Sequence, residues 1–277
     1  MAHDVAVQDF ASKQHWDQRW QDRQLPLKVN PANRSLHNYQ VVYFDRVFQR
    51  LFEQYRHGGA NHHPLHLMEV GCARSTWLPY FANRLGCQVQ GLDYSEHGCH
   101  MAEQILRQSR VDGQIHCADL FAPPAELQGQ FDVVVSFGVV EHFSDTSACL
   151  SQMARLAKPG GMLITIIPNM QGLPGLCQKW LDKDVYNIHV PLSAADLATA
   201  HIQAGLQVSE CRYHMSAGLQ VVSLESWPAN RWKRTAQKAK SMLTRTGWWL
   251  DRTFRLPANR ITSPCIICTA IKPLELS

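Results

Sequence analysis

Short apolar runs alternate with amphipathic segments along most of the chain. Leu65–Val70 and Val89–Leu92 are typical of buried strands. Between them an apolar face recurs at helical spacing, formed by Trp77, Leu78, Phe81 and Leu85. Further strands are expected at residues 114–117, 131–137, 162–167, 206–213 and 262–271. Strands that alternate with helices at this spacing predict an α/β fold with a parallel, doubly wound sheet.

Capping residues, glycine and proline mark the ends of the predicted helices. Ser95 and Ser193 stand where a side-chain oxygen can cap a helix N-terminus. The Lys-Pro-Gly-Gly stretch at 158–161 is a helix stop signal. The helices expected are residues 40–55, 95–110, 146–157, 177–182 and 193–205.

Composition is compatible with one elaborated globular domain. The chain has 277 residues, of which 45% are hydrophobic, and a net charge of +4 that does not by itself indicate nucleic acid. Nine Cys, scattered through predicted strands and helices, are typical of reduced thiols in a cytosolic protein. The one close pair, Cys265 and Cys268, should point to opposite faces of a strand, so no metal site is expected.

No targeting or membrane-spanning segment is expected. Met1–Phe10 contains two Asp residues and no apolar core region, unlike a signal peptide. The chain has no run of about eighteen apolar residues, the length that a transmembrane helix needs.

Small or polar residues follow the predicted strands at their carboxyl ends. A strand-to-helix turn presents backbone N–H groups, and an acid at the end of the next strand can accept hydrogen bonds from a ribose. Because these ends meet at one rim of a parallel sheet, we expect a site there for a nucleoside-containing cofactor. The rim residues are Gly71–Ser75, Asp93, Asp119, Gly138–His142, Pro168 and Asn169.

Five ordered motifs carry a resemblance to a known family: MEVGCARS, VQGLDYS, HCADL, FDVVVSFGVVEHFSD and LAKPGGMLITIIPN. Residues 65–215 and 262–272 resemble the class I S-adenosylmethionine-dependent methyltransferases. The small-molecule branch, which includes the ubiquinone-pathway O-methyltransferases, is the most similar. The resemblance implies a Rossmann-like sheet of seven strands whose last strand is antiparallel, with helical insertions after strands five and six.

The resemblance also implies S-adenosyl-L-methionine as cofactor and assigns residues to it. Asp93 would hold the ribose hydroxyls, and Tyr94 would pack beside the adenine. Asp119 would meet the adenine amino group, with Leu120 against the ring. The residues implied at the methionine and sulfonium end are Glu69, Gly71, Cys72, Ala73, Phe137 and Gly138.

The first turn departs from the family pattern. Residues 71–75 read Gly-Cys-Ala-Arg-Ser, where the family usually has Gly-x-Gly-x-Gly. A positive φ at Ala73 would cost roughly 1 kcal/mol or more. We therefore expect the turn to stay in allowed backbone space, with Ser75 capping the next helix. The competing interpretation, an NAD(P)-dependent oxidoreductase, needs Gly-x-Gly-x-x-Gly here, and the turn does not supply it.

Three side chains after strands four and five are candidates for a catalytic base. Methyl transfer from a sulfonium is an in-line displacement, in which the protein aligns the acceptor and removes its proton. His142 is the first, because an imidazole ordinarily titrates near neutrality and could accept a hydroxyl proton. Bracing of the motif by backbone hydrogen bonds is an equally good interpretation. Glu141 is the second candidate, and His189 is the third. The related O-methyltransferases resemble this chain in carrying a substrate-side His after strand five.

Trp16 and Trp20 lie four residues apart, on one face of a short helix. They are compatible with a brace or lid on the domain, and also with a lining for the cleft. Residues 1–60 are interpreted as an N-terminal helical lid segment, and residues 61–277 as the methyltransferase domain. The residues expected near the substrate are Trp16, Trp20, Tyr39, Tyr186 and Asn169.

Two insertions, residues 170–192 and 217–260, are expected to form a substrate cap. The second has nine Lys and Arg, two acidic residues and four of the eight Trp. We favour a cap with aromatic side chains inward and a solvated basic face. Docking of residues 227–260 on an anionic membrane is the second interpretation. Contact with nucleic acid is disfavoured by the modest net charge.

The sequence therefore predicts an S-adenosylmethionine-dependent methyltransferase that acts on a small or amphiphilic metabolite, at oxygen. One alternative is an S- or N-methyltransferase of a small molecule. An alternative of another class is a non-catalytic cofactor-binding or membrane-docking protein, suggested by Ala73 and Ser75. The Asn-Pro-Pro-Tyr motif of many amino-group methyltransferases is absent, which argues against DNA bases and protein amides. A cytoplasmic location is expected, with peripheral contact at the inner membrane surface as a variant.

Overall fold

A computed structural model describes residues 7–21, 23–59 and 64–274. The strands are β1 (His66–Val70), β2 (Gln88–Asp93), β3 (Gly113–Cys117), β4 (Phe131–Phe137), β5 (Ala157–Pro168), β6 (Gln207–His214) and β7 (Cys265–Ile271). The α-helices are α1 (Ser12–Trp20), α2 (Tyr39–His57), α3 (Trp77–Leu85), α4 (Glu96–Ser109), α5 (Thr146–Leu156), α6 (Leu173–Leu181), α7 (Lys183–Asn187), α8 (Ala194–Gln203) and α9 (Arg231–Phe254). Single 3-10 turns are η1 (Leu36–Asn38), η2 (Ala125–Leu127) and η3 (Val140–His142).

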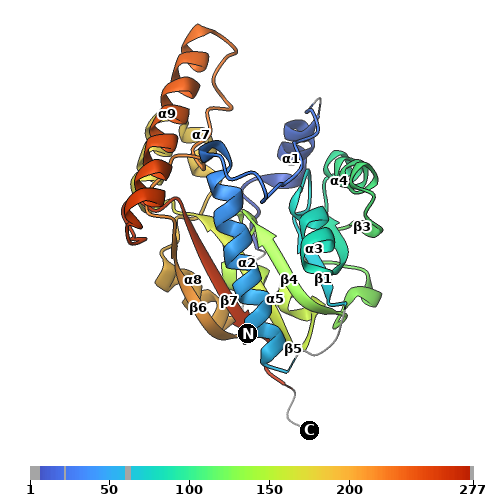
Figure 1. Ribbon diagram of the computed structural model, residues 1–277. Helices are drawn as coiled ribbons and strands as arrows, with labels where there is room; N and C mark the ends of the chain where they lie inside the picture. Colours follow the sequence, from blue (N-terminus) through green and yellow to red (C-terminus); the bar gives the residue numbers. More distant parts are fainter. Residues whose placement is uncertain (1–6, 22, 60–63, 275–277) are drawn as a thin grey trace, which may run out of the picture.

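The seven strands form one sheet in the order β3-β2-β1-β4-β5-β7-β6 (Figure 1). Strands β1 to β5 pair in parallel, whereas β7 is antiparallel to both β5 and β6. The predicted seven-stranded sheet with an antiparallel last strand is confirmed. Because the strand order reverses between β1 and β4, a crevice for ligands is expected at their carboxyl ends.

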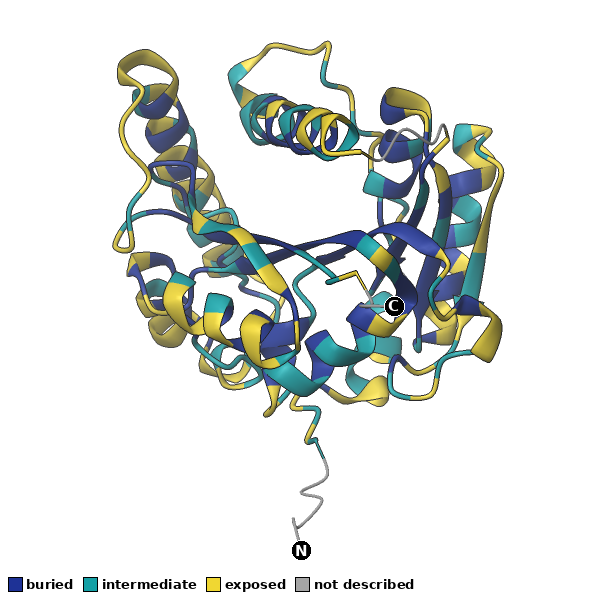
Figure 2. Ribbon diagram, turned by 90° about the horizontal axis from the view of Figure 1, so that it is seen from below, coloured by how far each residue is buried: buried dark blue, intermediate teal, exposed yellow. Residues whose placement is uncertain are grey.

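Helices cover both faces of the sheet, and strand residues alternate between two apolar clusters. Leu67 and Val133 join the cluster under α2 and α3, while their neighbours Met68 and Val134 join the cluster under α5 and α8. Cys265 and Cys268 fall in opposite clusters, as their spacing predicts. In Figure 2 the buried strands lie between helices whose outward faces are exposed.

Helix α5 ends at Leu156, within one residue of the predicted end and just before the Lys-Pro-Gly-Gly stretch. The predicted start of the next strand is wrong, because β5 starts at Ala157 and not at Met162, so residues 158–161 belong to this strand. Gly160 donates its N–H to the carbonyl of Lys272, and Lys272 donates to the carbonyl of Gly161. Pairing with the end of β7 therefore takes up residues that would otherwise form a free turn. None of the helices in the described part of the chain has the length and apolar character needed to cross a bilayer.

Candidate active site

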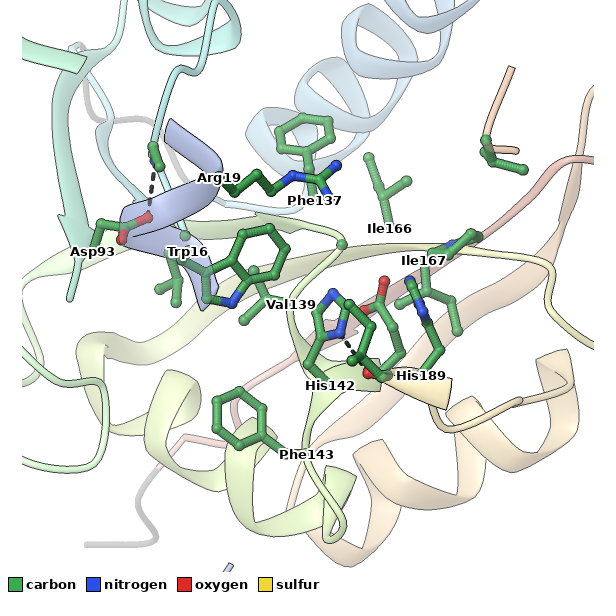
Figure 3. Close-up of a pocket in the computed structure, with 18 of the residues that line it drawn as sticks. Trp16, Arg19, Asp93, Phe137, Val139, His142, Phe143, Ile166, Ile167 and His189 are labelled. Carbon is green, nitrogen blue, oxygen red and sulfur yellow. Dashed lines mark hydrogen bonds between the residues drawn. The ribbon is translucent and has the colours of Figure 1, made fainter. Parts of the chain in front are cut away.

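A cavity of about 440 Å³ opens at the carboxyl ends of β1, β2 and β4 (Figure 3). Its floor is the predicted rim, and its other walls come from several segments. These include α1, α2, the start of α3, the 170–192 segment and residues 220–223 of the second insertion. The rim residues in its wall that were expected to bind a cofactor are Gly71, Ala73, Asp93, Tyr94, Asp119, Leu120, Phe137 and Gly138.

The first turn is shaped by backbone conformation at two positions. Gly71 has φ +73°, and a Cβ there would lie 2.4 Å from Val139 Cγ2, so no larger residue fits. The other positive φ, 57°, falls on Arg74 and not on Ala73. Ala73 therefore replaces the family's glycine without backbone strain, and the strain is at Arg74, contrary to the expectation of an unstrained turn.

Asp93 organises this turn and faces the cavity. Its Oδ2 accepts the N–H of Ala73 at 2.9 Å, and its Oδ1 accepts the N–H of Ser95 at 2.8 Å. A carboxylate oxygen has two lone pairs, so each oxygen can accept one more hydrogen bond. Burial raises the pKa of Asp93 to about 6, and the backbone hydrogen bonds from Ser95 and Ala73 oppose this rise. The carboxylate is thus placed to accept hydrogen bonds from two adjacent hydroxyls, which fits a ribose.

Glu69 and Cys72 support the turn from behind and are not part of the cavity wall. Glu69 is 2% exposed and accepts the Ser75 hydroxyl proton at 2.7 Å. Burial raises its pKa to about 8. Ser75 Oγ also accepts the N–H of Trp77 at 3.0 Å. The N-cap residue of α3 is Thr76, so the prediction that Ser75 caps this helix is wrong by one position. Cys72 packs under β2, where a Cβ on Gly91 would lie 2.5 Å from its Sγ.

The side chains near Asp119 connect the rim to the N-terminal segment. Tyr94 donates its hydroxyl proton to Asp9 at 2.6 Å. Asp119 accepts the N–H of Phe121 through Oδ1, which leaves Oδ2 for another donor. Leu120 is 7% exposed and contributes an apolar surface to the same wall. This combination of an acceptor with an apolar surface fits the edge and face of an adenine.

His142 and His189 stand together on the opposite side of the cavity (Figure 3). Their ring centroids are 4.5 Å apart. His142 Nδ1 lies 2.7 Å from the carbonyl of Ile188, and His189 Nδ1 lies 2.6 Å from that of Val185. Because a carbonyl only accepts, each Nδ1 carries a hydrogen and each Nε2 keeps a free lone pair. Burial lowers the pKa of His142 to about 4 and that of His189 to about 3, so both are neutral at pH 7.

Glu141 lies beside His142 and His189, but its protonation state differs from theirs. It is 1% exposed, and neither carboxyl oxygen has a hydrogen-bond partner within the described part of the protein. Burial raises its pKa to about 8, so the group is protonated at neutral pH. Glu141, His142 and His189 each offer one ligand atom, and these atoms lie within 4.8 Å of one another. Such a group could hold a metal ion, and the expectation of no metal stays a prediction.

The melting temperature of the ligand-free protein should fall as pH rises from 6.5 to about 8, and Glu141→Gln should lessen that fall. In the folded state Glu69 and Glu141 keep their protons up to about pH 8, whereas the ordinary pKa of a Glu side chain is 4.5. The unfolded state binds fewer protons in this window, so stability is lost as pH rises. A pKa that differs by about one between the folded and unfolded states changes the free energy of unfolding by up to about 1.4 kcal/mol.

Differential scanning calorimetry across this pH range measures the effect. Glu103→Gln on α4 is the control, because its side chain is 46% exposed in an i,i+4 pair with Arg107. If the melting temperature falls equally with pH in Glu141→Gln, in Glu103→Gln and in the unmodified protein, Glu141 is not a buried neutral acid.

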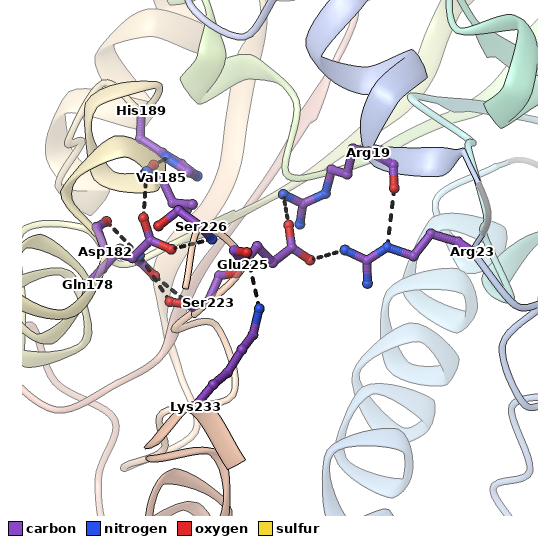
Figure 4. Close-up of polar contacts among 10 residues, drawn as sticks. All are labelled: Arg19, Arg23, Gln178, Asp182, Val185, His189, Ser223, Glu225, Ser226 and Lys233. Atoms are coloured by element: carbon purple, nitrogen blue, oxygen red, sulfur yellow. Dashed lines mark hydrogen bonds and ion pairs between the residues drawn. The ribbon is translucent and has the colours of Figure 1, made fainter. Parts of the chain in front are cut away.

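Helix α1 covers the cavity as a lid. Trp16 and Trp20 both line the wall, with their rings stacked at 5.8 Å, and Trp16 meets the edge of His142 at 5.2 Å. Arg19 lies above both indoles and pairs with Glu225 (Figure 4). Arg23, which follows the helix, donates to the other oxygen of Glu225 at 2.8 Å. The lid is therefore held shut by a carboxylate more than 200 residues away along the chain.

The loop that carries Glu225 is fixed to the 170–192 segment. Ser223 donates its N–H to Gln178 at 2.7 Å, and Ser226 donates its N–H to Asp182 at 3.0 Å (Figure 4). The two insertions thus form one cap, through residues 178–189 and 220–226. Helix α9 lies outside this cap, and none of its residues lines the cavity. The expected inward orientation of the aromatic side chains is wrong for Trp232 and Trp249, which are 61% and 51% exposed.

Three residues expected near a substrate lie outside the cavity wall. Tyr39 donates its hydroxyl proton to Asp251 of α9 at 2.9 Å, so it joins α2 to α9. Tyr186 faces the ammonium of Lys179. Asn169 is fully buried and donates to the carbonyls of Arg260 and Ser263, so it fixes the connection before β7.

Several residues of the cavity wall were not predicted from the sequence. Arg19 lies three positions after Trp16, a spacing that already indicated the same helical face. The helical spacing places Trp77 on the apolar face of its helix, but the side chain also lines the cavity and stacks on Phe137 at 5.8 Å. Phe44 of α2 and Gln220 reach the wall from segments whose position depends on tertiary packing.

The family model that matches this chain and the relatives most similar in sequence are all described as methyltransferases. The family model described as "Methyltransferase domain" matches residues 35–210. A ubiquinone biosynthesis O-methyltransferase of Sinorhizobium medicae is 30% identical over 141 residues, which cover 49% of this chain and 55% of that protein. The protein of that name from a Caulobacter species is 30% identical over 167 residues, covering 60% of this chain and 62% of that protein. The chain spans little more than half the length of these relatives.

Solved structures agree on the fold. Geranyl diphosphate C-methyltransferase from Streptomyces coelicolor superposes with a TM-score of 0.56 at 14% identity, covering 94% of this chain and 98% of that chain. Phosphoethanolamine N-methyltransferase 2 from Haemonchus contortus gives a TM-score of 0.51 at 17% identity, covering 80% of this chain and 52% of that chain. At these identities the likeness concerns the fold alone.

Proposed function

The chain belongs to the methyltransferase domain family, as a class I S-adenosylmethionine-dependent methyltransferase, and we propose that it methylates a hydroxyl oxygen of a small or amphiphilic metabolite. One observation carries the choice of oxygen. His142 and His189 present two neutral imidazoles, each with a free Nε2, to the same cavity that Asp93 faces. A hydroxyl acceptor must lose a proton as it is methylated, and a neutral imidazole can take that proton.

The residues of the rim fit S-adenosylmethionine. When bound, this cofactor supplies a methyl group on a sulfonium that is already activated for transfer. Asp93 would hold the two ribose hydroxyls through the free lone pairs of its carboxylate. Asp119 and Leu120 would hold the adenine, and the positive φ of Gly71 would let the backbone approach the methionine part. Ala73 keeps the contact to Asp93, so the altered turn gives no support to a non-catalytic protein.

His142 is the residue we assign to the proton. Its Nδ1–H is fixed on the carbonyl of Ile188, which sets the ring orientation and leaves Nε2 as the acceptor. The ring of His189 stands 4.5 Å away. Burial is the main reason for the low pKa of His142, and the nearby Arg19 and His15 lower it further. Protonated Glu141 beside them can donate a hydrogen bond to an acceptor oxygen.

The remaining walls support an acceptor with a large apolar part. Phe44, Trp77 and Phe137 form an aromatic side, and Trp16 closes it from the lid. Gln220 and other polar groups of the cap reach the same space and can bind a polar substituent.

A transfer assay with S-adenosylmethionine labelled in its methyl group tests this proposal. The panel pairs phenols with the matching thiols and anilines, each with and without an alkyl chain. We expect label to pass to the phenols, and alkylated phenols to react best. The activity should persist in the presence of a chelator. Transfer to thiols or anilines alone would replace the oxygen assignment by one of the alternatives.

A further inference from the structure

We propose that the outward face of α9 is a docking surface for an anionic lipid bilayer. This inference does not depend on the chemistry of the cavity, since none of the residues of α9 lines it. The surface is defined by the exposed apolar residues of α9 and the basic residues that flank them.

Large apolar side chains of α9 point into solvent. Their spacing along the chain is uneven, but on the helix projection they all fall on one half of the helix. Trp249 and Phe254 pack against each other at 6.1 Å although both are more than half exposed. The exposed fractions are 61% for Trp232, 59% for Met242, 56% for Leu243, 51% for Trp249 and 60% for Phe254.

The opposite face of α9 is the one that anchors the helix to the protein. Gly247 and Trp248 are buried, and a Cβ on Gly247 would already press on Ala217 at 3.3 Å. Thr244 accepts the N–H of Leu219, and Asp251 accepts the hydroxyl proton of Tyr39. The apolar half is therefore not the side by which the helix packs on its own domain. In Figure 1 the N-terminal half of α9 extends beyond the rest of the protein.

The exposed charged side chains of α9 are all basic. The helix contains seven Lys and Arg, and its one acidic residue, Asp251, is buried. No salt bridge among the described residues involves α9. On the helix projection Arg231, Arg234, Lys238, Arg245 and Arg252 lie along one border of the apolar half. A basic border beside exposed Trp, Met, Leu and Phe is the pattern of helices that lie in a membrane interface.

Helix α6 carries a second group of exposed apolar side chains. Leu176 and Trp180 are 51% and 83% exposed. The N-terminus of α6 joins the segment after α9, because Leu173 donates its N–H to the carbonyl of Ile261. On its inner side, Gln178 of α6 holds Ser223, which lines the cavity. A bilayer on this surface would lie next to the cap through which an amphiphilic molecule enters.

Charge and side-chain type favour a bilayer over other occupants. A second copy would bring the same positive charge to the interface, and like charges oppose association. Nucleic acid would satisfy the basic residues, but phosphate contacts do not use exposed Met242 and Leu243. Anionic lipid satisfies both, since its head groups attract Lys and Arg and its acyl region takes apolar side chains.

Co-sedimentation with vesicles tests the proposal on the full chain. Vesicles of phosphatidylcholine alone are compared with vesicles that contain about one third phosphatidylglycerol. We expect binding to the anionic vesicles that weakens as salt is raised. Met242→Ser with Trp249→Ser, and separately Arg234→Glu with Lys238→Glu, should each lower the partition coefficient at least about tenfold.

Matched substitutions elsewhere control for general effects. Ile202→Ser on α8 removes an apolar side chain that is 62% exposed, and Arg107→Glu on α4 reverses a charge far from α9. Both should bind vesicles as the unmodified protein does. Equal partition into both vesicle types, or unchanged binding of the α9 variants, would overturn the proposal. So would a dimer in sedimentation equilibrium that the same variants abolish. Vesicle binding needs neither cofactor nor acceptor, so its failure is separable from failure of the proposed methyl transfer.

Discussion

Replacing Asp93 by Ala should weaken the binding of S-adenosylmethionine by at least about 100-fold. The substitution removes two charge-assisted hydrogen bonds to the ribose, each of which contributes about 1.5–3 kcal/mol. It also releases the N–H groups of Ala73 and Ser95, so the turn that faces the cofactor loses its fixed shape. Calorimetric titration measures the dissociation constant directly.

Asp132→Asn is the matched control for this experiment. Asp132 is also a buried acid of the central sheet, but it lies near the start of β4, where it accepts from the N–H of His66 and from Lys158. It should affect stability and leave cofactor affinity unchanged. Unaltered affinity of Asp93→Ala, in a protein with a native circular dichroism spectrum, would remove Asp93 from the cofactor site.

Replacing His142 by Ala should lower kcat by about 10²–10⁴ with a hydroxyl acceptor, because general base catalysis contributes an effect of this size. Cofactor affinity should stay the same, since His142 lies on the acceptor side of the cavity. Added imidazole should restore part of the rate. In the unmodified enzyme the acid limb of the pH–rate profile should lie near pH 4, because burial holds the His142 pKa at about 4.

His189→Ala separates the roles of the two imidazoles. The ring of His189 packs against that of His142, but burial is the main cause of the low pKa of His142. Removal of His189 should therefore leave the acid limb near pH 4 and reduce kcat less than loss of His142 does. The reverse order of effects would assign the proton to His189. If both variants keep more than about a tenth of the unmodified rate, the loss is smaller than removal of a general base usually causes. Such a result would indicate an acceptor that needs no base, such as a thiolate.

The rim could be predicted from sequence because it depends on local patterns. A parallel strand buried on both faces appears as a short apolar run, and the residue after it must lie at the carboxyl edge of the sheet. Asp93 and Gly138 stand directly at the ends of such runs, His142 follows a few residues later, and all three reach the cavity. For the same reason all seven strands could be predicted, although β5 starts earlier and β7 later than the apolar pattern indicates.

The lid and the cap depend on contacts that no local pattern encodes. Arg19 meets Glu225 across most of the chain, and neither position has a sequence signal beyond its charge. Helix α9 has an amphipathic pattern, but the pattern does not say which face packs on the protein. Its buried side is set by Gly247 and Asp251 against the 215–219 loop and Tyr39, while its larger apolar half faces outward.

Calorimetric titration of the unmodified protein with S-adenosylmethionine tests the central claim most directly, with NADH as the comparison. The geometry of Asp93 and the turn at Gly71 predicts one saturable site per chain for S-adenosylmethionine and no binding of NADH. Absence of heat and of any melting shift at high S-adenosylmethionine concentration, in protein shown to be folded, would contradict the account. Binding of NADH in its place would contradict it equally.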